Sequence, residues 1–144
     1  MTKISNTNAY PFDTEIAGDE YLVGTEPDGS VQNQTKSFKL SDIKGYILGY
    51  KGYVANLSQT GTSAPIATVM VNEIGDITLS RVGAGEYAIA SSNLFVNGKT
   101  TVNINNSTNG DVISASYDAA DLITITTSGD NQLSNTTVEI RVYS

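Results

Sequence analysis

The stretch TTVEIRVY, residues 136–143, decides the fold class, because aliphatic side chains alternate with polar or charged ones along it. The aliphatic side chains of Val138, Ile140 and Val142 share one face of an extended chain, and the charged side chains share the other. A period of two is typical of a strand with one buried face. The stretch therefore predicts a strand that packs on a hydrophobic core.

Outward from this strand, the chain from residue 50 onwards reads as a series of similar short strands with no helical period. Asn-Gly pairs at 97–98 and 109–110 are strong hairpin signals. We therefore predict an all-β domain over residues 50–144, an antiparallel β-sandwich or a small barrel. Its roughly eight strands are Tyr50 to Ser58, Ile66 to Asn72, Ile77 to Val82, Glu86 to Ser91, Thr100 to Asn105, Asp111 to Tyr117, Leu122 to Thr127 and Thr136 to Tyr143.

The first third of the chain is richer in charged residues than the rest. It predicts a small module, residues 1–49, of a β-hairpin and a short helix. After a polar arm, an apolar run at 21–23 and an alternating run at 35–40 flank a Pro-Asp-Gly turn. Ser41 is a candidate N-cap for a helix over 42–48. A hairpin and a two-turn helix are marginal alone in water. The module must therefore pack on the β-domain, on a sister subunit or on a larger assembly.

The composition excludes several kinds of catalytic site. The 144 residues include no His and no Cys, which excludes a Ser-His-Asp triad, a thiol nucleophile and a histidine or thiolate metal site. Eight Lys and Arg stand against fifteen Asp and Glu, a net charge of −7 that lacks the basic footprint of nucleic-acid binding. We therefore expect a binding or structural protein with no enzymatic activity, no cofactor and no bound metal.

Targeting and membrane signals are not found in the sequence. No apolar run approaches the ~18 residues of a membrane span, and the first twenty residues hold no apolar segment of a secretory signal. We expect no membrane insertion, and the lack of Cys fits assembly in a reducing cytoplasm.

The acidic pairs leave two alternative chemistries open. A glycosidase needs one pair of carboxyl groups across a cleft, and Asp118 with Asp121 is one of three close acidic pairs in the chain. The same two residues, with Asp130 and Asn131, could offer oxygens to calcium. Acids in turns more often accept hydrogen bonds from nearby backbone groups, which is the interpretation that we favour. Gly83 and Gly85 form part of a phosphate-loop pattern, but a tight hairpin explains them better.

The tyrosines divide into two groups. Those in or beside predicted strands are expected in the core or in cross-strand pairs, with a sugar-stacking face as the alternative: Tyr53, Tyr87, Tyr117 and Tyr143. Those of the opening third fit an interface better, where amphipathic rings are enriched: Tyr10, Tyr21 and Tyr46.

Two stretches resemble known proteins. DEYLVGT at 19–25 and TKSFKLSDIKGYI at 35–47 are together similar to an N-terminal segment of tailed-bacteriophage fibre and other virion proteins. YVANLSQTGTSAPIATV at 53–69, followed by Gly75, Arg81 and GEY at 85–87, resembles a small β-domain of phage structural proteins and of Bacteroidetes-type bacteria. The first resemblance implies attachment to the virion, and such fibres and decorations are usually homotrimers.

The leading hypothesis is therefore a non-enzymatic virion protein, a short head or tail fibre or a decoration protein. It would be made in the bacterial host cytoplasm, displayed on the virion surface and bound to capsid, portal or tail proteins. The alternative is a β-sandwich that recognises a receptor or a host-surface glycan through Tyr, Asn and Thr. The residues expected to anchor the module are Tyr21, Leu22, Val23, Phe38, Leu40, Ile43, Tyr46 and Ile47.

Overall fold

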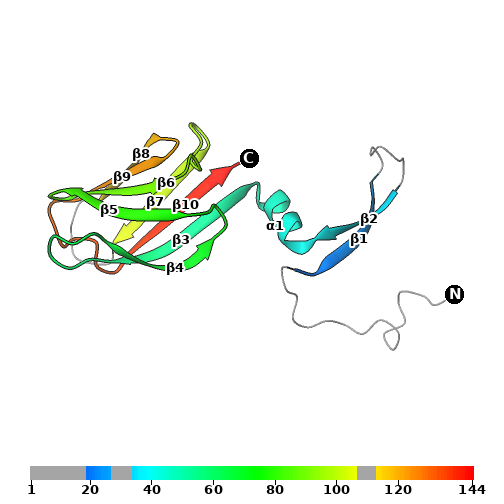
Figure 1. The fold of residues 1–144 in the computed structure, drawn as a ribbon, viewed down its shortest axis with the longest axis horizontal. Coiled ribbons are helices and arrows are strands. Elements are labelled where there is room, and N and C mark those ends of the chain that lie inside the picture. Colours follow the sequence, from blue (N-terminus) through cyan, green and yellow to red (C-terminus); the bar gives the residue numbers. More distant parts are fainter. Residues whose placement is uncertain (1–18, 27–33, 107–112) are drawn as a thin grey trace, which may run out of the picture. The chain divides into compact units, whose positions relative to one another are not determined.

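A computed structural model describes residues 19–26, 34–106 and 113–144 of the chain (Figure 1). The chain divides into two compact units, Met1–Leu48 and Gly49–Ser144. In the part of the chain that the structure describes, no helix is long and apolar enough to cross a membrane.

The first unit is a β-hairpin followed directly by a helix. Strand β1 (Tyr21–Glu26) pairs antiparallel with β2 (Gln34–Lys39), and α1 (Leu40–Leu48) begins at the next residue. The backbone N–H of Leu40 donates to the carbonyl oxygen of Glu20 at 3.0 Å, which ties the start of the helix to the start of the hairpin. Because α1 begins at Leu40, Ser41 lies in the first turn and is not the N-cap that the sequence predicts.

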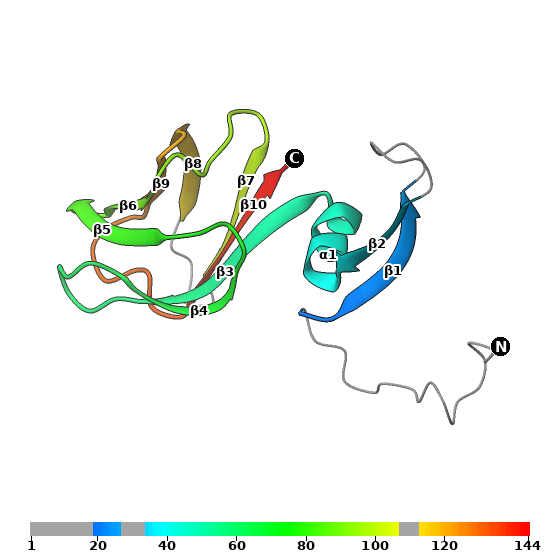
Figure 2. The same cartoon turned by 45° about the vertical axis from the view of Figure 1, so that its right-hand side comes forward.

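The second unit contains eight strands in two four-stranded antiparallel sheets (Figures 1 and 2). One sheet has the order β4–β3–β10–β7 and the other β5–β6–β9–β8. The bounds of the strands are β3 (Tyr50–Ser58), β4 (Ile66–Asn72), β5 (Ile77–Gly83), β6 (Glu86–Ser91), β7 (Thr100–Asn106), β8 (Ser114–Ala119), β9 (Leu122–Thr126) and β10 (Thr136–Tyr143).

The hydrophobic core lies between these two sheets. Alternate residues of β3, β10, β6 and β9 point inward, and β10 is buried at every second position from Thr136 to Ile140. Every apolar side chain that is buried in the described chain belongs to the second unit: Tyr53, Ala55, Leu57, Ile74, Tyr87, Ala88, Ile89, Phe95, Ile123, Ile125, Leu133, Val138 and Ile140.

The predicted fold class is confirmed: the protein is mainly β, with a sandwich-like pair of sheets preceded by a hairpin and a short helix. Four of the eight predicted sandwich strands have the predicted bounds, among them β3 and β10. The strand predicted at 111–117 is β8, which runs from Ser114 to Ala119, whereas residues 111–112 lie outside the described residues. The Pro-Asp-Gly turn at 27–29 and Tyr10 also lie outside them.

Candidate functional site

The hairpin carries an aromatic ring on each of its faces. Strand pairing sets Tyr21 opposite Lys39 and Leu22 opposite Phe38, and neighbouring pairs point to opposite faces. The ammonium group of Lys39 lies 5.9 Å from the centre of the Tyr21 ring. On the other face the Phe38 ring covers Gly24, where an added Cβ would lie 3.0 Å from Phe38 Cε2. The hairpin therefore offers apolar contacts on two sides.

None of residues 19–25 and 34–48 is buried, although they form two strands and a helix. In α1 the side chain of Tyr46 is 90% exposed and that of Ile47 is 74% exposed. The exposed large apolar side chains define what we call the apolar hairpin–helix surface: Tyr21, Leu22, Val23, Phe38, Tyr46, Ile47 and Leu48. Exposure of so many large apolar side chains in a small unit is typical of an interaction site.

Part of this surface forms a groove between the hairpin and the helix. The groove has a volume of about 610 Å³. The residues that line it include the charged Lys39 and Asp42. Its lining consists of Tyr21, Ser37, Phe38, Lys39, Asp42, Ile43 and Tyr46.

The groove brings together half of the residues that the sequence predicts as anchors. Those that line it are Tyr21, Phe38, Ile43 and Tyr46. Leu22, Val23 and Ile47 are exposed outside its lining, and Leu40 is half-buried at the start of α1. Sequence reasoning missed Ser37, Lys39, Asp42 and the exposed Leu48. The position of Lys39 beside Phe38, at the junction of strand and helix, is the signal that could have found it.

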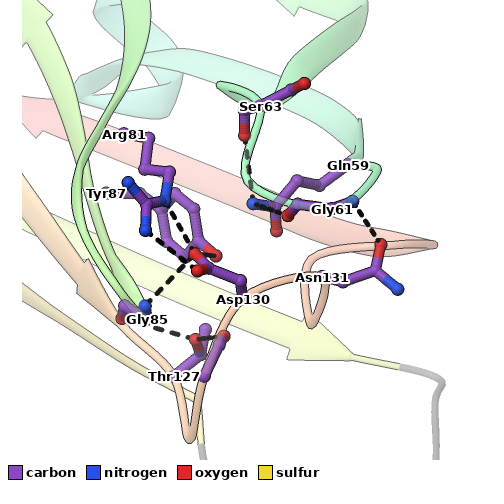
Figure 3. A network of polar contacts seen from close by, with 10 residues as sticks. Gln59, Gly61, Ser63, Arg81, Gly85, Tyr87, Thr127, Asp130 and Asn131 are labelled. Carbon is purple, nitrogen blue, oxygen red and sulfur yellow. Dashed lines mark hydrogen bonds and ion pairs between the residues drawn. The ribbon is translucent and has the colours of Figure 1, made fainter.

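The second unit holds a polar network at one end of the sandwich (Figure 3). The guanidinium of Arg81, from β5, donates from Nε and Nη2 to the two carboxylate oxygens of Asp130 at 2.8 and 2.9 Å. The Tyr87 hydroxyl donates to the same carboxylate at 3.3 Å, as does the Gly85 backbone N–H at 3.5 Å. The network fastens the loop between β9 and β10 to the β5–β6 hairpin, so its role is structural.

The hydrogen bonds of this network shift the titration of both charged groups. The Arg81 guanidinium, followed by the Gly85 N–H and the Tyr87 hydroxyl, holds the pKa of Asp130 below its ordinary value. The Asp130 carboxylate in turn raises the pKa of Arg81. Asp130 is therefore an ion-pair partner, whereas the sequence predicts for acids in turns only hydrogen bonds from nearby backbone groups.

Loss of the Asp130 charge should change the response of stability to acid. A native pKa below the unfolded value of about 3.9 gives a contribution to stability that is present above pH ~4 and lost as pH falls through the native pKa. We expect Asp130→Asn to lower the thermal midpoint at pH 7, with a gap to the parent protein that narrows between pH 5 and pH 2. The control Asp76→Asn alters an exposed turn acid, and its thermal midpoint should stay close to that of the parent protein at every pH. A gap for Asp130→Asn that is the same at pH 7 and pH 2 would contradict this explanation.

Two other side chains considered as oxygen ligands, those of Asp118 and Asn131, have structural partners. The Asp118 carboxylate accepts hydrogen bonds from the hydroxyls of Ser116 and Thr124, on its own strand and on its neighbour. Asn131 has a φ of +66° and accepts a hydrogen bond from the Gly61 N–H at 3.1 Å. Among the described residues, no group of three or more acidic side chains is placed to hold a metal ion. Asp118 and Asn131 therefore support strand and backbone geometry.

Comparisons with family models, with curated proteins and with solved structures give no match for this chain. Its function therefore has to be inferred from the fold and from the exposed surfaces.

Proposed function

We propose that the protein is a non-enzymatic structural protein of a bacteriophage virion, a short fibre or a decoration protein. Its hairpin and helix dock on neighbouring subunits, and its sandwich is displayed. One observation carries the proposal: no described side chain of the first unit is buried, whereas seven large apolar side chains are exposed there. The resemblance of residues 19–25 and 35–47 to virion attachment segments points in the same direction.

The first unit has little to keep it folded by itself. A hairpin and a nine-residue helix without a core receive little hydrophobic stabilisation to offset the loss of chain entropy. Burial of one large apolar side chain contributes about 1.5–3 kcal/mol. Burial of Tyr46, Ile47 and Val23 in an interface would therefore supply stabilisation that the unit lacks by itself.

The charges around the apolar surface favour association between copies of the chain. Residues 19–26 and 34–48 contain three lysines and four acids, so this part is nearly neutral in a chain of net charge −7. A positively charged residue, Lys39, and a negatively charged one, Asp42, line the same groove. Copies can therefore approach through this surface with little net repulsion. A homotrimer formed in this way would then bind capsid, portal or tail proteins.

The proposal is tested on purified particles of the phage that encodes the chain. An antibody raised against residues 49–144 should label intact particles in electron micrographs, and peptides of the chain should be found in the particle by mass spectrometry. Detection of the chain only in the infected-cell lysate, and never in purified particles, would overturn the proposal.

A further inference from the structure

The outward face of the β4–β3–β10–β7 sheet carries a polar cleft of about 480 Å³. Alternate residues of β10 point away from the core, so Thr137 and Glu139 face outward. The register places Asn105 beside Thr137 and Asn103 beside Glu139 on the neighbouring strand β7. The cleft is lined by Asn103, Ile104, Asn105, Thr137 and Glu139.

Asn103 and Asn105 of β7 have no structural task in the described chain. Asn is depleted in strands, and both side chains are exposed. Neither Asn103 nor Asn105 has a side-chain hydrogen bond to a described residue, and the same holds for the hydroxyl of Thr137. By contrast, Asn72 bonds Gly75 through both its amide oxygen and its amide nitrogen. The cleft thus presents two amides and a hydroxyl that are available to a ligand.

A positioned carboxylate completes the polar set. The Arg141 Nε donates to Glu139 Oε1 at 2.7 Å, and both side chains are about one-third exposed. Arg141 is held in turn, because its guanidinium lies 5.0 Å from the centre of the Tyr50 ring. The Tyr50 ring packs against that of Tyr143, with 5.4 Å between the ring centres. Glu139 is therefore fixed on a strand that is paired on both sides, with its charge compensated.

We propose that this cleft and the strip of β10 beside it bind a neutral oligosaccharide. Amides, a hydroxyl and a carboxylate offer the mixture of donors and acceptors that adjacent sugar hydroxyls require. The outward strip from Thr137 to Tyr143 covers about 20 Å of extended strand and ends at two tyrosine rings. A sialylated or sulfated glycan is disfavoured, because Arg141 is already paired and the chain is negative.

This inference does not rest on the docking role of the first unit. The cleft lies wholly on strands of the second unit, and the apolar hairpin–helix surface lies wholly in the first. Failure of glycan binding would leave the oligomeric mass unchanged, and failure of assembly would leave the side chains of the cleft in place.

The test uses the fluorescently labelled full chain on an array of neutral oligosaccharides and their sialylated counterparts. We expect binding to a subset of the neutral glycans, and a signal that is at least tenfold weaker for N103A/N105A. The matched control N97A removes an exposed asparagine amide outside the cleft and should bind as the parent does. Circular dichroism should show the same fold for all three proteins, because none of the changed side chains is buried.

Three results would overturn the inference. They are the absence of signal on every neutral glycan, binding confined to the sialylated glycans, and equal signals for the parent and N103A/N105A. Light scattering on the same samples establishes that any loss of signal does not come from a change in oligomeric state.

Discussion

Tyr46→Asp is expected to weaken self-association of the full chain by about a hundredfold, and Ile47→Asp by a similar factor. Each loses the burial of one large side chain, about 1.5–3 kcal/mol, and places a charge in an apolar interface. A loss of ~2.8 kcal/mol corresponds to a hundredfold change in affinity. Because Tyr46 is 90% exposed in the single chain, its replacement removes almost no contact within the unit. The effect therefore reports on a partner surface and not on folding of the unit.

The control for this pair is Ser41→Asp. Ser41 is exposed on the same helix, away from the groove lining, and an acid in the first turn of a helix is favourable. Analytical ultracentrifugation gives the dissociation constant of each variant. Equal dissociation constants for Tyr46→Asp and Ser41→Asp would show that the apolar hairpin–helix surface is not the contact between copies.

The second large effect is expected from Gly85→Ala, because the surrounding backbone leaves no room for a side chain at this position. Gly85 has a φ of +72°, and a Cβ at this position would lie 2.7 Å from the Thr127 carbonyl oxygen and 3.1 Å from the Gly129 nitrogen. Both are backbone atoms, so the loop that carries Asp130 has to move. Gly98 provides a matched control, because its φ is +71° and no atom lies within 4 Å of its added Cβ.

Gly98→Ala should therefore lower the free energy of unfolding by about 1–2 kcal/mol, the cost of a left-handed backbone for a residue with a Cβ. Gly85→Ala carries the same cost and, in addition, about 1–3 kcal/mol for the steric clash. Urea unfolding followed by circular dichroism measures both values. If the two variants lose the same free energy, the close approach between Gly85 and the loop has no energetic consequence.

The fold could be predicted from the sequence because its main signals are local. The alternation in TTVEIRVY identifies β10 and its inward face, and all eight sandwich strands follow from similar patterns and turn residues. The Arg81–Asp130 ion pair could not be predicted, because its partners are 49 residues apart and meet only when the β9–β10 loop folds against β5. Local patterns carry no information about which distant loops meet.

The same limit applies to the candidate sites. The apolar run at 21–23 and the helix stripe with Tyr46 and Ile47 indicated exposed anchors, because a two-turn helix cannot bury them alone. The polar cleft was not predicted, since it depends on the register that sets β7 beside β10, between strands far apart in the sequence. Alternation places Asn103 and Asn105 on one face, but only the sheet order brings Thr137 and Glu139 next to them.

The most direct test of the docking role compares the oxidation of two tyrosines by hydroxyl radicals in the native full chain. In a single chain Tyr46, 90% exposed, should react faster than Tyr143, which is 38% exposed. If neighbouring chains cover the apolar hairpin–helix surface, Tyr46 should react more slowly than Tyr143 in the assembled protein, and dilution below the dissociation constant should reverse the order. Faster oxidation of Tyr46 at every concentration, or protection that persists on dilution, would contradict the claim that other subunits complete this unit.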